Sequence, residues 1–275
     1  MSRDTDTWEF EIKLLLEAIF FKYRSDFRHY STSSIRRRLG IALPKLGLQT
    51  ISQLQDKILA DPAVFDFILQ HLSVPTTEMF RDPSYFAALR TEVFPVLATY
   101  PSLKIWSAGC STGEEVFSLA ILLHEERLLS RSLIYATDIN PASLRSAQAG
   151  ILAQDELAKF TANYQKAGGK AAFSDYYTAG EKGAFLHQEL LDRMVFADHS
   201  LATDSVFAEV QLVSCRNVLI YFTKPLQDRA FGLFHDSLSK RGFLGIGSKE
   251  SVRFSTYRDQ FQEFDARQKI YRKAQ

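Results

Sequence analysis

The sequence predicts an α/β protein in which a small all-helical N-terminal domain precedes a Rossmann-like domain with an inserted small antiparallel β-subdomain. Apolar residues recur at helical spacing through residues 8–72, without strand signals. From about residue 100, short apolar runs alternate with helical segments, which is typical of a mainly parallel sheet. Glycines punctuate residues 168–193 and predict a β-meander there. We therefore expect a helical domain over 1–75, a linker over 76–100 and an α/β domain over 101–275.

Composition favours an ordinary globular protein over disulfide-rich, metal-binding, secreted or membrane-spanning classes. The chain has 275 residues, 46% hydrophobic and 24% charged, which is ordinary globular composition. Two cysteines are too few for a disulfide framework, and the six histidines show no metal-ligand spacing, so no metal site is expected. The N-terminal segment lacks a signal-peptide core, and the apolar runs are too short to cross a membrane. We expect a cytoplasmic protein without direct membrane insertion.

Local signals place the individual elements. Ile51–Ala60 and Pro62–Leu72 read as helices, the second with Asp61 as N-cap and Pro62 at the first helical position. Serines before residue 35 predict a capped short helix that stops at Gly40. In the second half we expect strands at 103–109, 133–137, 194–196, 210–213 and 243–246, helices at 113–129, 141–149 and 225–238, and a terminal antiparallel pair within 261–271.

A glycine-rich turn is the strongest chemical signal. Gly109 and Gly113 lie between a predicted strand and a helix that opens with Glu114 and Glu115. Such glycines let a ligand approach the backbone, and an acidic residue at the end of the next strand, Asp138, suits a ribose diol. Two glutamates would repel a pyrophosphate but attract a cation, which favours S-adenosylmethionine over a dinucleotide. The alternative is an ordinary turn whose acidic residues favour the helix dipole.

A second polar string follows the predicted strand at 210–213. It runs from Cys215 through Arg216 and Asn217 to Tyr221. Polar residues at the carboxyl end of a strand point into the crevice of an open sheet, where ligands bind. The alternative, that Arg216 and Asn217 are simple turn residues, is disfavoured by the apolar runs on both sides.

These motifs together resemble those of CheR-type chemotaxis receptor methyltransferases. The matching strings are Phe80-Arg81-Asp82-Pro83, Ser111-Thr-Gly-Glu-Glu115 and Cys215-Arg-Asn-Val-Leu-Ile-Tyr-Phe222, and the resemblance covers roughly residues 20–273. It implies the class I S-adenosylmethionine-dependent methyltransferase fold. It also implies methyl transfer from S-adenosylmethionine to glutamate side chains of methyl-accepting chemotaxis receptors, for signalling adaptation.

The resemblance also implies a set of cofactor contacts. They are Thr77, Arg81, Gly109, Glu114, Glu115, Asp138, Ser200, Leu201, Asn217 and Val218. Within the set, either glutamate would serve the methionine end, Asp138 the ribose, and Ser200 and Leu201 the adenine. Two departures stand out. Pro75 replaces a family asparagine, and the family string Gly-His-Ser-Glu reads Gly247-Ser248-Lys249-Glu250 here, so its histidine is absent.

The implied reaction needs little acid–base chemistry. A glutamate carboxylate, with a pKa of about 4.3, is ionised at neutral pH and needs no general base. Catalysis should then depend on positioning and on controlled desolvation. We expect Tyr221 and Arg216 to be the catalytic residues, with the Tyr221 hydroxyl as a neutral donor that orients the substrate. The alternative for Tyr221 is a core aromatic residue.

A basic segment over residues 22–45 predicts the partner surface. Arg28, Arg36, Arg37 and Arg38 would dock the acidic cytoplasmic helical region of a receptor. The alternative is a solvated helix face. We expect the enzyme to be a monomer that is recruited to membrane receptor arrays.

Two other functions compete with receptor methylation. A nucleic-acid methyltransferase would favour an Asp/Asn-Pro-Pro-aromatic string where this chain has Cys215-Arg-Asn-Val, so no nucleic-acid partner is expected. A non-catalytic cofactor-binding scaffold is disfavoured because Arg81, Asp138 and Asn217 are all present.

Overall fold

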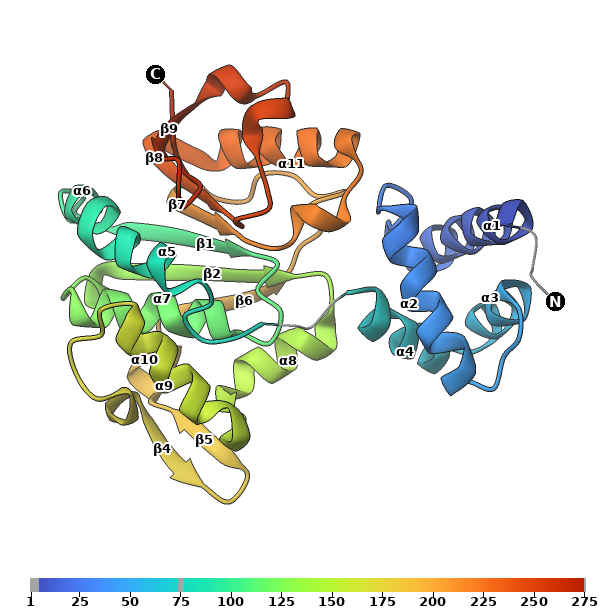
Figure 1. The fold of residues 1–275 in the computed structure, drawn as a ribbon, viewed down its shortest axis with the longest axis horizontal. Helices are drawn as coiled ribbons and strands as arrows, with labels where there is room; N and C mark the ends of the chain where they lie inside the picture. Colours follow the sequence, from blue (N-terminus) through green and yellow to red (C-terminus); the bar gives the residue numbers. More distant parts are fainter. Residues whose placement is uncertain (1–4, 74–76, 275) are drawn as a thin grey trace.

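The structure is a computed structural model that describes residues 5–73 and 77–274. Figure 1 shows the N-terminal helices beside a larger α/β body. The helical domain contains α1 (Thr5–Tyr23), α2 (Thr32–Lys45), α3 (Ile51–Ala60) and α4 (Pro62–Leu72). Across the described ranges, no helix combines the length and the apolar character needed to cross a membrane.

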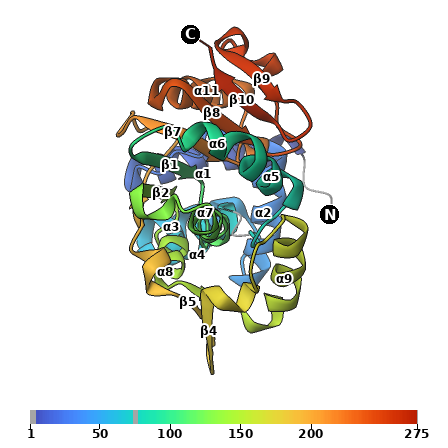
Figure 2. The ribbon, with the colours of Figure 1, turned by 90° about the vertical axis from the view of Figure 1, so that its left-hand side faces the viewer.

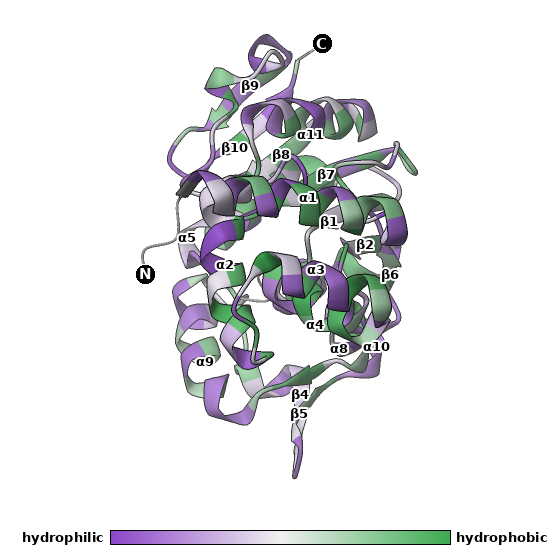
Figure 3. Cartoon of the chain, turned by 90° about the vertical axis from the view of Figure 1, so that its right-hand side faces the viewer, coloured by the Kyte–Doolittle hydropathy of each residue, from purple (hydrophilic) through white to green (hydrophobic). Residues whose placement is uncertain are grey.

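The helices of this domain bury one face each. Polar and apolar segments alternate along them (Figure 3), and their apolar side chains form a separate core. Helix α4 begins as predicted, since the Asp61 carboxylate accepts the backbone N–H of Ala63 at 2.9 Å. The predicted stop at Gly40 is wrong, because α2 continues to Lys45. Burial of Leu39 and Leu43 on the same side outweighs the cost of an interior glycine, about 1 kcal/mol.

The main sheet has seven strands in the order β6-β2-β1-β7-β8-β10-β9. The first five are mutually parallel, and β10 and β9 are antiparallel additions at one edge. This matches the mainly parallel sheet and the terminal antiparallel pair predicted from the sequence. The strands are β1 (Leu103–Ala108), β2 (Ser132–Asp138), β6 (Met194–Asp198), β7 (Val210–Cys215), β8 (Leu238–Ile246), β9 (Phe261–Asp265) and β10 (Ile270–Lys273).

Alternate strand residues enter two different cores. Ile105 packs on one face of the sheet with helix α7 (Glu114–Glu125), whereas Trp106 packs on the other with α11 (Lys224–Ser237). Figures 1 and 2 show these helices on opposite sides of the strands. Helix α8 (Pro141–Ala149) follows β2. The carboxyl ends of β1, β2 and β7 therefore meet at one edge, which faces the helical domain.

The segment predicted as a linker between the domains is largely helical. It contains α5 (Pro83–Ala88), a π-helical turn (Leu89–Val93) and α6 (Phe94–Leu97), whose apolar side chains join the core of the sheet. These buried residues make this segment part of the α/β body.

The small antiparallel sheet differs in one strand from the predicted meander. Its order is β3-β5-β4, with β4 (Tyr177–Gly180) and β5 (Gly183–Leu186) inside the predicted range. The third strand, β3 (Ile151–Leu152), lies before that range and is separated from β4 by helix α9 (Leu157–Lys166). A two-residue strand has no sequence period of its own, so its pairing could not be predicted.

A buried carboxylate attaches this subdomain to the body. Glu125, at the end of α7, accepts the hydroxyls of Tyr164 and Tyr176 at 2.5 and 2.9 Å and the backbone N–H of Lys170 at 2.7 Å. It also forms an ion pair with Arg90. Burial alone would raise the pKa of Glu125, but the hydrogen bonds from Tyr164 and Arg90 hold this pKa below its usual value. We refer to Arg90, Glu125, Tyr164 and Tyr176 as the Glu125 cluster.

Short backbone contacts join the two domains. The Ser31 N–H donates to the Tyr221 carbonyl at 2.7 Å, and the Thr223 N–H donates to the His29 carbonyl at 2.9 Å. A side-chain bond from Asn140 Nδ2 to Ser73 Oγ, 2.7 Å long, connects the domains a second time. These contacts bring the end of the helical domain over the carboxyl edge of the sheet.

Candidate functional site

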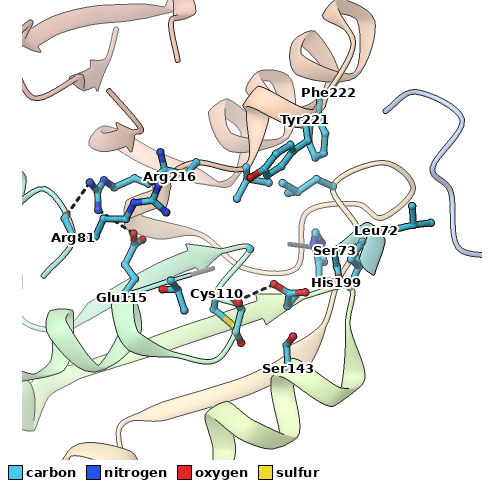
Figure 4. A pocket seen from close by; sticks show the side chains of 18 of the residues that line it. Leu72, Ser73, Arg81, Cys110, Glu115, Ser143, His199, Arg216, Tyr221 and Phe222 are labelled. Atoms are coloured by element: carbon cyan, nitrogen blue, oxygen red, sulfur yellow. Dashed lines mark hydrogen bonds and ion pairs between the residues drawn. The ribbon is translucent and has the colours of Figure 1, made fainter. Parts of the chain in front are cut away.

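A cavity lies at the carboxyl edge of the sheet, between the two domains (Figure 4). Most of the predicted site residues line it, which brings together segments far apart in the chain. They are Thr77, Arg81, Gly109, Glu115, Asp138, Leu201, Arg216, Asn217, Val218 and Tyr221.

The glycine turn forms the floor of the cavity. Its first residue, Gly109, leaves no room for a side chain. Gly109 has a φ of +76°, and a Cβ at this position would lie 2.5 Å from Cγ2 of Val218. The Gly109 N–H donates to the Thr137 carbonyl at 2.8 Å, which ties the turn to the end of β2. Gly113, with a φ of +101°, then leads into α7. The turn thus places cavity-lining residues beside the ends of β1 and β2.

Asp138 organises this turn. One carboxylate oxygen accepts the Ser111 N–H at 2.8 Å and the other accepts the Asn140 N–H at 2.9 Å. A carboxylate has about four lone-pair sites, so acceptor capacity remains for the hydroxyl groups of a ligand. Burial raises the pKa of Asp138 above its usual value, against the effect of these backbone hydrogen bonds.

Arg216 and Glu115 form a buried pair at one end of the cavity. Arg216 Nη1 lies 3.2 Å from a Glu115 oxygen, and Nη2 donates to Asp82 at 2.7 Å and to the Arg81 carbonyl at 3.0 Å. The guanidinium also lies 4.2 Å from the ring centre of Tyr85. The Arg216 side chain is 2% exposed, and these contacts occupy both of its terminal nitrogens. This geometry favours a role in positioning Glu115 and the Arg81 backbone.

Two residues predicted to contact the cofactor do not line this cavity. Glu114 lines a neighbouring cavity that also includes Thr77 and Arg81, and it accepts the Thr112 hydroxyl at 2.7 Å. Burial raises the pKa of Glu114. Of the two glutamates, Glu115 is therefore the one that faces the main cavity. Ser200 is occupied locally, since its N–H donates to Asp204 and its hydroxyl accepts the Ala202 N–H.

Tyr221 lines the cavity at the domain boundary and packs against Arg38 of the helical domain. The Arg38 guanidinium carbon is 4.7 Å from the Tyr221 ring centre. Its nitrogens donate to Ser34 Oγ and to the carbonyls of His71 and Leu72. Arg38 is buried, so its predicted place on an exposed docking surface is wrong.

The other predicted docking arginines are more accessible. Arg36 and Arg37 are exposed on α2, and Arg36 lies 5.7 Å from the Trp8 ring centre. Arg28 is partly exposed and forms ion pairs with Asp26 and Glu17.

Several lining residues were missed by sequence reasoning. Tyr30, Leu72 and Ser73 come from the helical domain, and Figure 4 shows Leu72 and Ser73 at the cavity edge. No local signal marks them, because their position depends on domain packing. His199 was also missed, although it precedes the predicted pair Ser200 and Leu201. The departure at Pro75 lies outside the described residues.

The donor set fits an S-adenosyl group. Asp138 can accept ribose hydroxyls, the Glu115 carboxylate and the Arg81 side chain can serve an amino-acid end, and Leu201 and Val218 offer apolar surface for a purine. The Glu115 carboxylate can face the ammonium group of such a ligand, and the Arg81 side chain can face its carboxylate. The fold and this site together define an S-adenosylmethionine-dependent methyltransferase.

Comparison with known proteins identifies the family. Residues 75–270 match the model described as "CheR methyltransferase, SAM binding domain", and residues 11–73 match "CheR methyltransferase, all-alpha domain". The chain belongs to the CheR methyltransferase family. It is 57% identical over 272 residues to "Putative methyltransferase Cher3" of Pseudomonas putida, covering 99% of this chain and 98% of that protein. It is 28% identical over 229 residues to the "Chemotaxis protein methyltransferase" of Listeria innocua, covering 82% and 84%.

Proposed function

We propose that this enzyme transfers a methyl group from S-adenosylmethionine to glutamate side chains of chemotaxis receptors. The observation that carries the proposal is the placement of Tyr221 and Arg38 at the domain boundary of the cofactor cavity. A substrate that enters between the two domains would meet the Tyr221 hydroxyl directly. The relatives named as chemotaxis protein methyltransferases support the same substrate class.

The cofactor supplies an electrophilic methyl group on a sulfonium when it is bound. The chain's own residues have three tasks. Asp138 and the Gly109 turn fix the ligand's position, since both are held by backbone hydrogen bonds. Glu115 offers negative charge to the amino group of the ligand, and Arg216 keeps Glu115 in place.

The substrate carboxylate needs orientation more than activation. It is ionised at neutral pH, so no residue has to remove a proton. A strong ion pair to this carboxylate would slow its attack, because the carboxylate loses its charge as the ester forms. The neutral Tyr221 hydroxyl avoids that penalty. Arg38 stacks on the Tyr221 ring while its nitrogens bind Ser34 and two backbone carbonyls, so we assign it to holding Tyr221 rather than to pairing with substrate.

The receptor is expected to approach across α2. Arg36 and Arg37 are exposed there and offer positive charge to an acidic receptor helix. Encounter at this face would bring a receptor glutamate towards the domain boundary.

The test is site mapping by mass spectrometry. Receptor-containing membranes are incubated with the purified enzyme and S-adenosylmethionine, and receptor peptides are sequenced. We expect the mass of one methyl ester on glutamates of the receptor's cytoplasmic helices, and much less of it with Asp138→Ala at a low S-adenosylmethionine concentration. Methylation confined to other side chains or to nucleic acid would overturn the proposal.

A further inference from the structure

Glu250 is a buried carboxylate that lies outside the cavity and has no role in the mechanism above. It follows β8 by a short turn and is 5% exposed. Its partners are all backbone N–H groups. One oxygen accepts from Gly247 at 2.5 Å and from Asn217 at 3.2 Å, and the other accepts from Ile220 at 3.3 Å.

These bonds join the ends of two adjacent parallel strands. Cys215, the last residue of β7, pairs in register with Ile246, the last residue of β8. Glu250 then connects the two segments that leave these strands. On the β7 side, its two contacts flank Val218, the residue that packs against Gly109 in the cavity floor. The segment held by Glu250 is therefore the one that supplies Asn217, Val218 and Tyr221 to the cavity.

The local backbone turns sharply at the residue that Glu250 binds. Asn217 has a φ of +62°, a left-handed conformation that asparagine adopts more readily than most residues other than glycine. Gly247 allows the close approach, because a Cβ there would lie 2.8 Å from both the Asn217 nitrogen and the Glu250 carboxylate. An ionised carboxylate is the only side-chain group of this size that accepts on both ends and donates on neither. Burial raises the pKa of Glu250, so the fold retains this group despite an electrostatic cost.

We propose that Glu250 is a positioning residue that fixes residues 216–221 so that Asn217, Val218 and Tyr221 reach the cofactor and the substrate. The proposal deepens, and rests on, the assignment of the cavity proposed above. It concerns cofactor binding, so it is tested with S-adenosylhomocysteine and does not depend on the identity of the methyl acceptor.

Glu250→Gln is the sharpest substitution. The amide keeps the shape but has one acceptor, so its NH2 group must face at least one of the three N–H donors. We expect the dissociation constant of S-adenosylhomocysteine, measured by calorimetry, to rise about tenfold as one buried N–H loses its partner. Glu263→Gln is the matched control. Glu263 is 41% exposed and pairs with Arg253 on the surface, so its loss should change affinity by less than about twofold.

Two further variants separate positioning from general stability. Gly247→Ala disturbs the same contact from the opposite side and should weaken binding in the same way. In an Asn217→Ala background, Glu250→Gln should have a smaller effect than in the parent, because both act through one segment. Each variant is measured at a temperature where urea unfolding shows it to be folded.

If Glu250→Gln does not fold, Gly247→Ala and its cycle with Asn217→Ala decide the question. The proposal is overturned if the folded variants bind S-adenosylhomocysteine as tightly as the parent. It is also overturned if the effects of the two sites simply add.

Discussion

The cofactor crevice, which is the cavity between the two domains, and the Glu125 cluster both contain buried carboxylates. The two regions stabilise the carboxylate charge in different ways. Asp138 and Glu250, beside the crevice, are held by backbone N–H groups, and burial raises the pKa of each. Glu125, at the opposite end of α7 from the glycine turn, has Arg90 and two tyrosine hydroxyls as partners. The pKa of Glu125 is lowered instead. Burial alone would raise this pKa, but the hydrogen bonds from Tyr164 and Arg90 have the larger effect.

This difference in partners indicates different roles for the carboxylates of the two regions. Asp138, stabilised only by N–H groups, keeps acceptor sites that hydroxyl groups of a ligand can use. Glu125 lies outside the cavity and is enclosed by Arg90 and two tyrosine hydroxyls, and its removal takes away one of the two carboxylates paired with the buried Arg90. We therefore expect substitutions in the crevice to affect ligand binding, and substitutions in the Glu125 cluster to affect folding.

The largest expected effect is on stability, from Glu125→Gln. The side chains of Glu125 and Arg90 are 3% and 9% exposed, and Glu125 accepts several charge-assisted hydrogen bonds. Loss of its charge should lower the free energy of unfolding by about 3 kcal/mol, although Arg90 keeps its ion pair with Glu126. Urea unfolding measures this, and S-adenosylhomocysteine affinity should be unchanged. Weaker ligand binding with unchanged stability would reverse the roles of the two regions.

The pH dependence of stability, compared between the parent and Glu125→Gln, gives a second test. Because the pKa of Glu125 is lower in the folded than in the unfolded state, its contribution is complete at neutral pH and is lost as the pH falls through the folded-state value. The stability difference between the parent and Glu125→Gln should therefore shrink below about pH 4. A difference that grows on acidification would show that the carboxyl is not held in its ionised form.

Asp138→Ala should have the next largest effect, on binding. Loss of charge-assisted hydrogen bonds costs about 1.5–3 kcal/mol, so S-adenosylhomocysteine should bind about 10- to 150-fold more weakly. Asp198→Ala is the control. Asp198 lies opposite Asp138 in the register of β6 against β2, but it is exposed. Affinity of Asp138→Ala within about threefold of the parent would contradict the ribose assignment.

Tyr221→Phe tests the substrate side of the crevice. Removal of one neutral hydroxyl donor should lower kcat by about fivefold, because a typical hydrogen bond contributes about 1 kcal/mol. Cofactor affinity should stay the same. Turnover equal to that of the parent would leave Tyr221 as a packing residue.

The smallest expected effect comes from the surface of α2. Arg36→Glu combined with Arg37→Glu should raise the KM for receptor several-fold and weaken its dependence on salt, because exposed charges mainly steer encounter. Turnover at saturating receptor should not change, since these residues lie away from the cavity. Identical receptor kinetics in a folded variant would support the solvated-face alternative.

The parts of the site that could be predicted are those with a local signal. Gly109 and Asp138 lie at strand ends, where a period change in the sequence marks the position of the crevice. Tyr30 and Ser73 could not be predicted, because only the packing of the helical domain brings them to the cavity.

The errors have the same origin in long-range packing. Three consecutive arginines give one local signal, but burial of Arg38 against Tyr221 depends on a residue far away in the chain. The continuation of α2 through Gly40 and the pairing of Ile151–Leu152 with β5 likewise depend on tertiary contacts. Glu250 was visible only as part of a family string, and its contacts required the structure.

The central claim is that methyl transfer in this crevice ends on a carboxylate. The most direct measurement uses S-adenosylmethionine with a radiolabelled methyl group, receptor-containing membranes and the purified enzyme, followed by treatment with base. A glutamate methyl ester releases its label as volatile methanol. The account predicts that most of the transferred label is released in this way, and that Asp138→Ala transfers much less label at a low S-adenosylmethionine concentration. Label that stays bound after base treatment, on protein nitrogen or on nucleic acid, would contradict it.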